Sequence, residues 1–307
     1  MSISVNFPDV VFYHANCPDG FGAAWSYWRE QRRLEKNHPE LRNTPLELYP
    51  ISHHQTDLPS VKGKNVVMVD VVLDDPSQMN ALVNEAKSFY LLDHHQSAYD
   101  LYKDEPWAFF NLEKSGSVLA WEDSHPGQDI PLLLQCIQDR DLEKTLNSDV
   151  EAILQVVDST TRSFYDWELL YQNLENHPEL VLQNGHLMRD RVYAAIERLT
   201  KNALPIAMGG YQGWAINAPV EFGLMVVSKL LDRPNTDFGF SWYVDHCGLV
   251  RGSWRSQSMD VIELAKIYNG GGHPYSSGAS MTLNDIHEIL NIPERKRKTE
   301  KILSVCK

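Results

Sequence analysis

Apolar runs and amphipathic stretches alternate along the first third of the chain. Runs rich in strand-forming residues predict strands at residues 9–15, 46–52, 65–72, 89–95 and 105–113. Stretches with helical spacing lie between them at residues 20–35 and 75–88. The second of these begins with a candidate cap, Asp75 or Asp74, and has Pro76 near its first turn. Strands alternating with amphipathic helices favour a parallel sheet that helices cover on both faces.

The pattern turns helical between residues 115 and 201 and then brings back glycine and strand formers at residues 204–218. Residues 239–256 predict a hairpin, and residues 258–270 predict a helix that Gly270 ends. We therefore predict an α/β protein of two domains. Residues 1–200 would form a parallel-sheet domain that includes the helical segment at about 115–200, and residues 205–307 a smaller α/β domain with a mixed sheet.

Composition narrows the class of protein. The 307 residues suffice for one large or two ordinary domains, and 43% hydrophobic with 22% charged residues is typical of soluble globular chains. No apolar run approaches the roughly 20 residues of a membrane helix, and the first residues do not resemble a secretory signal. The four cysteines are far apart and form no CxxC pair, which argues against a zinc ribbon or a disulfide framework. We expect a cytoplasmic protein without a membrane partner.

The formal net charge of −13 argues against a sequence-independent grip on long nucleic acid, which depends on many Lys and Arg contacts to phosphates. It leaves room for a small anionic substrate, because bound metal ions can invert the field at one site. The one basic run, residues 293–301, is typical of a solvated helix face.

Side chains suited to metal binding follow several predicted strands. In open parallel sheets, ligands gather at the carboxyl ends of the strands. The residues expected to converge there are His14, Asp19, Asp70, His94 and, from a helix, Asp139. Histidine and carboxylate ligands suit manganese, iron, zinc or a similar ion, and a crowded set could hold two ions about 3.5–4 Å apart. Each residue alone has an ordinary structural role, so the convergence carries the prediction. His53 and His54 end another strand and read by default as a polar loop.

A second motif is the glycine run Gly270–Gly272, which His273 follows. Consecutive glycines lose much conformational entropy on folding, so they make sense where the backbone approaches another group closely or presents N–H groups to an anion. A flexible loop after a helix is the alternative. Arg251 and Arg255 lie upstream and favour an anion site, because a guanidinium pairs with phosphate in a forked geometry.

The pair of motifs, Asp93-His94-His95 and Gly270–His273, resembles the DHH phosphoesterases with their DHH-associated C-terminal domain. The resemblance spans nearly the whole chain. The stretch YHANCPDGFGAAW, residues 13–25, is most similar to a bacterial branch that degrades very short RNA, including linear dinucleotides. Membership implies a catalytic domain with two metal ions, usually manganese, and a smaller domain that closes over the substrate.

The resemblance also implies roles for individual residues. His14 and Asp70 would bind one ion, while Asp19, Asp70, His94 and Asp139 would bind the other, with Asp70 bridging. Asp93 would orient a ligand, and His95 would face the phosphate or the leaving group. Gly271, Gly272, His273 and Arg255 would hold the substrate, with Arg251 a further candidate. The family has two carboxylates two residues apart in its first motif, and here Asn16 lies near the place of the missing acid. The first ion would then bind loosely, or Asn16 would not bind.

The favoured hypothesis is a metal-dependent phosphodiesterase that cleaves short oligoribonucleotides, linear dinucleotides foremost, to mononucleotides. One alternative is a phosphatase of the same fold for a nucleotide 3′,5′-bisphosphate or a short polyphosphate. Another is a non-catalytic nucleotide-binding protein that has lost one metal, an alternative that Asn16 keeps open. The sequence leaves open the base preference, the direction of attack, the resident metal and the oligomeric state, a dimer included.

Overall fold

The computed structural model describes residues 7–39, 45–52, 55–73 and 75–290. The chain forms two compact units, Met1–Arg189 and Asp190–Lys307, and the division falls within one long helix, α8 (Pro178–Thr200). His53, His54, Asp74 and the basic run at residues 293–301 lie outside the described residues. Within the described ranges, no helix combines the length and the apolar character that crossing a membrane requires.

The first unit is built on a parallel sheet, as predicted. Its strands are β1 (Val10–His14), β2 (Glu47–Ile51), β3 (Asn65–Val69), β4 (Ser88–Asp93) and β5 (Ala108–Phe110). They lie in the order β2-β1-β3-β4-β5, and every pairing is parallel. All five carboxyl ends therefore meet at one edge of the sheet, where β1 ends in His14 and β4 in Asp93.

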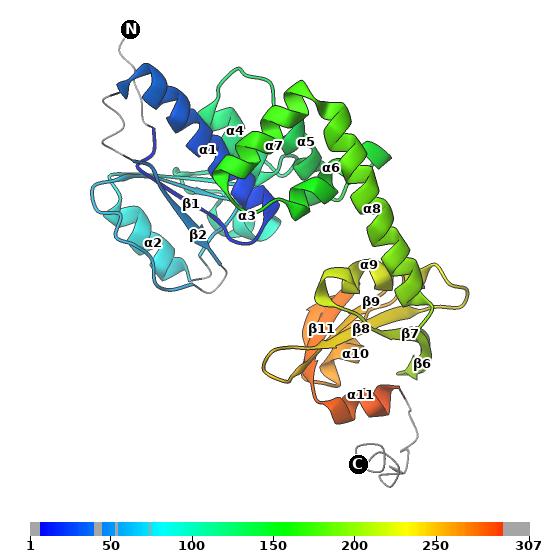
Figure 1. Cartoon of the computed structure of the whole chain (residues 1–307). Helices are drawn as coiled ribbons and strands as arrows, with labels where there is room; N and C mark the ends of the chain where they lie inside the picture. The colour runs from blue at the N-terminus through cyan, green and yellow to red at the C-terminus, as the bar shows by residue number, and fades with distance from the viewer. Residues whose placement is uncertain (1–6, 40–44, 53–54, 74, 291–307) are drawn as a thin grey trace, which may run out of the picture. The chain divides into compact units, whose positions relative to one another are not determined.

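Helices cover both faces of this sheet (Figure 1). They are α1 (Pro18–Asn37), α2 (Pro76–Glu85), α3 (Gln96–Tyr102), α4 (Gly116–Ser124), α5 (Leu132–Asp141), α6 (Ser148–Ser159), α7 (Phe164–Asn176) and the first part of α8. Successive residues of β1 point to opposite faces. Val11 joins a buried cluster with Trp25 of α1, and Phe12 joins another with Met79 of α2. Two apolar cores therefore hold the strand ends rigidly in place.

The second unit contains the predicted mixed sheet. Its strands are β6 (Leu204–Met208), β7 (Tyr211–Asn217), β8 (Phe238–Val244), β9 (Val250–Arg255), β10 (Gly271–His273) and β11 (Ser276–Met281). The order is β10-β11-β9-β8-β7-β6, in which β7 and β8 pair in parallel and the other neighbours antiparallel. The helices are α9 (Val220–Leu231), α10 (Ile262–Lys266) and α11 (Leu283–Ile289). The hairpin predicted at residues 239–256 forms as β8 and β9, with Gly248 at φ +80° in its turn.

Candidate metal centre and anion-binding face

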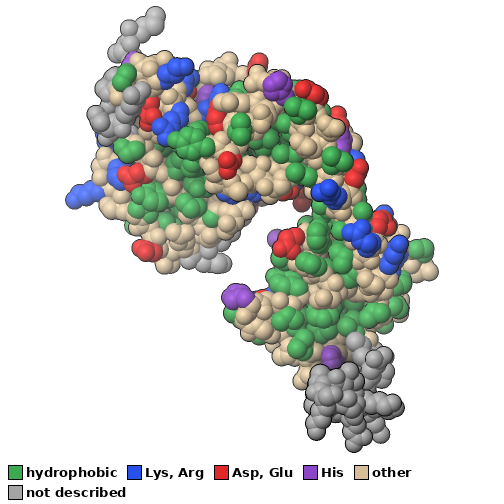
Figure 2. Space-filling view, in the orientation of Figure 1, with side chains coloured by type: hydrophobic (Ala, Val, Ile, Leu, Met, Phe, Trp, Pro, Cys, Tyr) green, Lys and Arg blue, Asp and Glu red, His purple; other side chains and the backbone are tan. Residues whose placement is uncertain are grey.

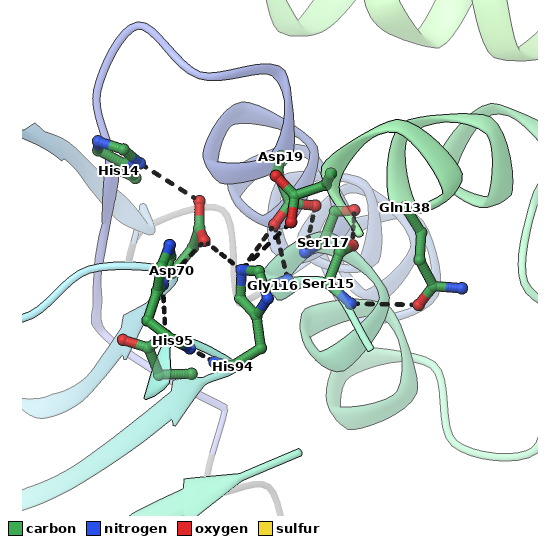
Figure 3. A network of polar contacts seen from close by, with 11 residues as sticks. His14, Asp19, Asp70, His94, His95, Ser115, Gly116, Ser117 and Gln138 are labelled. Carbon is green, nitrogen blue, oxygen red and sulfur yellow. Dashed lines mark hydrogen bonds and ion pairs between the residues drawn. The ribbon is translucent and has the colours of Figure 1, made fainter. Parts of the chain in front are cut away.

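Asp70 lies at the centre of the polar cluster in the first unit. It follows β3 with a left-handed φ of +63°, a conformation that is uncommon for non-glycine residues and concentrates at functional sites. Its carboxylate is 2% exposed. Its Oδ2 atom is 3.6 Å from His14 Nδ1, and its Oδ1 atom is 3.1 Å from His94 Nε2. Asp70 thus lies between two imidazoles and presents a different oxygen to each (Figure 3).

Asp19 is buried against the start of α4. Its Oδ2 accepts a hydrogen bond of 2.6 Å from the N–H of Gly116, and its Oδ1 accepts one of 3.0 Å from the N–H of Ser117. These bonds satisfy donors that a helix leaves free at its N-terminus. A Cβ atom on Gly116 would lie 2.5 Å from Asp70 Cβ and 2.9 Å from Asp19 Oδ2, so only glycine lets α4 begin so close to the acids. Sequence reasoning missed this role, for which Ser115-Gly116-Ser117 at a helix start was the available signal.

His94 connects Asp70 to a further acid, Asp141, the last residue of α5. His94 Nε2 is 3.3 Å from Asp141 Oδ2 and 3.9 Å from Asp19 Oδ2. This corrects the prediction that Asp139 would join the cluster. Asp139 is instead paired with Lys144, with Oδ1 and Nζ 2.9 Å apart. Residues two positions apart project roughly 200° apart around a helix, so only one of the two acids can face His94.

Asp93 fixes the two histidines that follow it. Its Oδ1 accepts hydrogen bonds from the backbone N–H groups of His94 (2.6 Å) and His95 (2.9 Å), and it is 2.8 Å from His95 Nδ1. Asp93 is fully buried, whereas the His95 side chain is 48% exposed. If Nδ1 carries the proton shared with Asp93, the Nε2 atom of His95 is left for a partner outside the protein.

The turn between β1 and α1 places Cys17 beside His14. Cys17 Sγ belongs to a group, with ligand atoms of His14 and Asp70, in which all atoms lie within 4.8 Å of one another. Asn16 is exposed and has a left-handed φ of +57°, which asparagine tolerates better than most residues. The structure therefore gives Asn16 a conformational role in the turn and brings the Cys17 thiol close to His14 and Asp70, in the motif where binding by Asn16 was left open.

The cluster suits divalent cations. Ligand atoms gather in three groups, each within 4.8 Å: His14, Cys17 and Asp70; Asp70, His94 and His95; and Asp19, His94 and Asp141. Asp70 Oδ2 and Asp141 Oδ2 are buried and accept no hydrogen bond from the described residues. Burying a carboxylate oxygen without a partner is costly, and a cation would remove that cost. Nitrogen and oxygen donors at these positions fit one or two divalent ions.

The pKa values of the acids and histidines in this cluster also indicate that the buried carboxylates require nearby positive charge. Burial, together with repulsion from Asp70 and Asp141, raises the pKa of Asp19 to about 7. The nearby Asp70 carboxylate raises the pKa of His14 to about 10. Burial works to lower the pKa of His94, but its bond to Asp70 and the charges of Asp70, Asp19 and Asp141 together outweigh burial and raise this pKa to about 9. Without a metal ion, charged imidazoles are what balance the buried carboxylates.

In the second unit, Arg255 and His273 share one face of the mixed sheet. Ser276 of β11 pairs with His273 of β10 on one side and with Arg255 of β9 on the other. Directly paired residues point to the same face of a sheet, so the guanidinium and the imidazole are two strands apart on that face. Arg255 and Arg251 also line a cavity of about 290 Å³ together with Ser241, Tyr243, Ser253 and residues of α9. Arg251 donates through Nε to Asp245 Oδ2 at 2.7 Å.

Two of the three glycines, Gly271 and Gly272, lie in the strand β10 and not in the loop that the sequence analysis considered. A Cβ atom on Gly270 would overlap the carbonyl oxygen of Gly278, and one on Gly272, at φ +141°, would lie 2.6 Å from the carbonyl oxygen of Ser276. The close approach predicted from the glycines is therefore to the neighbouring strand β11. Gly271 has no heavy atom within 4 Å of its added Cβ position, and its role towards an anion stays a prediction.

Comparison with known proteins identifies the fold. No protein-family model matches the sequence. The chain is 27% identical over 296 residues to uncharacterized protein R106 of Acanthamoeba polyphaga mimivirus, covering 89% of this chain and 68% of that protein. The structure superposes with a TM-score of 0.60 on the DHH domain of a protein from a family of ribosomal proteins, at 13% identity, over 92% of this chain and 84% of that one. The chain has the DHH fold.

The DHH fold covers both units, because this superposition includes nearly the whole chain. The resemblance drawn from Asp93-His94-His95 and Gly270–His273 is thus confirmed for the fold. A further similar structure is the pGpG-specific phosphodiesterase PggH from Vibrio cholerae, with a TM-score of 0.49 and 13% identity over 91% of this chain and 95% of that one.

Proposed function

We propose that this protein is a metal-dependent phosphoesterase that hydrolyses linear dinucleotides and other very short oligoribonucleotides to mononucleotides. One observation carries the proposal. Asp70, held in a left-handed conformation, belongs to two candidate ligand groups at the carboxyl edge of a DHH-fold sheet. A carboxylate shared between two groups is the arrangement that a pair of ions requires in enzymes that cleave phosphoesters.

The ligands divide between two subsites. His14 and Asp70 would hold one ion, and the second would take Asp19, Asp70, His94 and Asp141, the last in place of Asp139. Bound divalent ions would neutralise phosphate charge. They would also lower the pKa of a bound water molecule, so that it can act as a nucleophile at neutral pH. Manganese is the ion we propose, in line with the motif resemblance.

His95 is the proposed proton donor to the leaving oxygen. Asp93 contacts its Nδ1 atom at 2.8 Å and both backbone N–H groups nearby, so the ring is held in one orientation. The exposed half of the side chain can reach a substrate. A buried carboxylate that orients an imidazole in this way also stabilises the protonated ring that the reaction needs.

The second unit is proposed to bind the substrate through Arg255, His273 and the backbone at Gly271 and Gly272, with Arg251 a weaker candidate because Asp245 already holds it. A guanidinium binds a phosphate through two parallel hydrogen bonds. On the face drawn in Figure 2, the Lys and Arg side chains of the described residues form separate groups and no continuous stripe. Proteins that track a long single strand use such a stripe, so this surface favours a short substrate.

The test compares kcat/KM for RNA of two, three, five and ten nucleotides at a fixed manganese concentration. We expect the highest value for the dinucleotide, a fall with length, and mononucleotides as products. Asp70→Ala protein, purified in parallel, controls for contaminating nucleases. A flat or rising trend with length would reject the dinucleotide proposal. Release of phosphate from a nucleotide 3′,5′-bisphosphate would favour the phosphatase, and tight nucleotide binding without turnover would favour a binding protein.

A further inference from the structure

Cys17 lies at the start of α1, but its side chain does not cap the helix. It is the N-cap residue of α1, a position that favours Ser, Thr, Asp and Asn because their oxygens accept a hydrogen bond from the first turn. The Cys17 side chain makes no such bond. Its Sγ atom lies instead within 4.8 Å of ligand atoms of both His14 and Asp70.

The backbone brings this thiol to the cluster. His14 ends β1, Cys17 precedes α1, and Asn16 between them is left-handed with φ +57°. Asp70 supplies an independent sign that the cluster binds a cation. Its carboxylate is 2% exposed, and the oxygen that faces His14 at 3.6 Å, Oδ2, has no hydrogen-bond partner among the described residues. A cation held by His14, Cys17 and Asp70 would satisfy that oxygen.

We propose that Cys17 is a metal ligand in its thiolate form and completes, with His14 and Asp70, a subsite of nitrogen, sulfur and oxygen donors. The inference rests on the proposed metal dependence and not on the proposed substrate. Thiolate donors select zinc, cobalt or iron, whereas carboxylate donors suit manganese and magnesium. The group of Asp19, His94 and Asp141 contains no sulfur. The two subsites would therefore prefer different metals.

The chain offers a matched control for a test at this thiol. Cys247 is exposed in the second unit and has no part in the proposed site, whereas Cys136 is buried in the core of the first unit. Cys17→Ser and Cys247→Ser make the same chemical change at two places. Cys17→Asp restores a charged oxygen donor at the proposed ligand position.

The experiment titrates the metal-free full-length protein with Co²⁺ and records the near-ultraviolet charge-transfer absorption that a thiolate ligand gives. We expect this band in the wild type and in Cys247→Ser, and its loss in Cys17→Ser and Cys17→Asp. Zinc affinity, measured by calorimetry, should fall on the order of 100-fold in Cys17→Ser, because even residues that only support a ligand contribute about 10–100-fold. Cys17→Asp should regain affinity for manganese above that of Cys17→Ser. Circular dichroism and the Tm of each variant establish that it is folded.

A band of unchanged intensity in folded Cys17→Ser, or bound Co²⁺ without a band in the wild type, would overturn the assignment. The experiment distinguishes failure of this ligand assignment from failure of the proposed phosphoesterase activity. A cobalt–thiolate band in a protein that hydrolyses no phosphoester would support Cys17 as a ligand and reject the activity. Metal-dependent hydrolysis without the band would do the reverse, and a wild type that binds no Co²⁺ would reject the inference.

Discussion

Gly116→Ala tests whether the close packing of α4 against the acids positions the site. The added Cβ would lie 2.5 Å from Asp70 Cβ and 2.9 Å from Asp19 Oδ2. Carbon atoms pack at about 3.5–4.0 Å, so Asp70 and the start of α4 would have to separate by about 1 Å. The N–H of Gly116 would also move from Asp19 Oδ2, which it now meets at 2.6 Å. Both acids are proposed ligands, and the substitution removes neither of them.

Two magnitudes follow from this displacement. Overpacking of a tight site costs about 1–3 kcal/mol of folding stability. A misplacement of about 1 Å in a catalytic arrangement can lower the rate about 100-fold. We therefore expect Gly116→Ala to fold with a modestly lower stability and to lose on the order of 100-fold in kcat on a dinucleotide, with weaker manganese binding.

Gly127→Ala is the matched control. Gly127 has φ +76° and no heavy atom within 4 Å of its added Cβ position, so alanine there introduces only backbone strain, about 1–2 kcal/mol. Urea unfolding, calorimetry with manganese and steady-state kinetics should show similar stability losses in the two variants but a functional loss in Gly116→Ala alone. Wild-type turnover and manganese affinity in folded Gly116→Ala would refute the argument that this glycine positions the site.

Three further predictions concern separate parts of the chain. Asp70→Ala should lower turnover on the order of 100-fold or more, and chelation should abolish wild-type turnover until manganese is restored; normal rates in either case would show that the site is misplaced. Arg255→Ala should mainly raise KM, and a change confined to kcat would argue against a binding role. His125 is buried beside Trp121, and burial lowers its pKa to about 4. In the folded protein the imidazole stays neutral down to about pH 4, whereas in the unfolded chain it takes up a proton below about pH 6.5. The free energy of unfolding should therefore fall by up to about 3 kcal/mol as the pH drops from 7 to 4. Urea unfolding should show a smaller fall in His125→Asn; an equal fall would exclude His125 as the cause.

Strand periodicity and the parallel-sheet rule predicted much of the site from the sequence. His14, Asp70 and His94 follow or end apolar strands, so the rule that carboxyl ends meet at one edge brings them together. Asp19 could be predicted at the same edge because it lies in the first turn of the helix after β1. The choice between Asp139 and Asp141 could not be made in this way, because it depends on the rotation of α5 about its axis, which packing determines.

The sequence analysis also missed the role of Cys17 and two helices of the second unit, for different reasons. The Cys17 thiol faces His14 because Asn16 is left-handed, and a sequence pattern does not reveal that backbone choice. The helix α9 was not predicted, although its buried residues Gly223, Val226, Val227 and Leu230 recur at helical spacing and offered a usable signal. The helix α11 carried a usable local signal, since Thr282 and Asp285 form a capping box at its start.

Departures from ordinary folding rules coincide at the carboxyl edge of the first sheet. Asp70 is one of two described residues other than glycine and asparagine with a positive φ, and Asn16, in the turn that carries Cys17, also has one. Three buried carboxylate oxygens there, of Asp70, Asp93 and Asp141, accept no hydrogen bond from the described residues, and Gly116 admits no side chain. The unpaired carboxylate oxygens and the left-handed backbone of Asp70 cost folding stability, and sequences generally keep such conflicts only where function requires them. A bound cation would resolve the carboxylate conflicts, which favours a metal centre over a structural accident on grounds independent of the DHH motif.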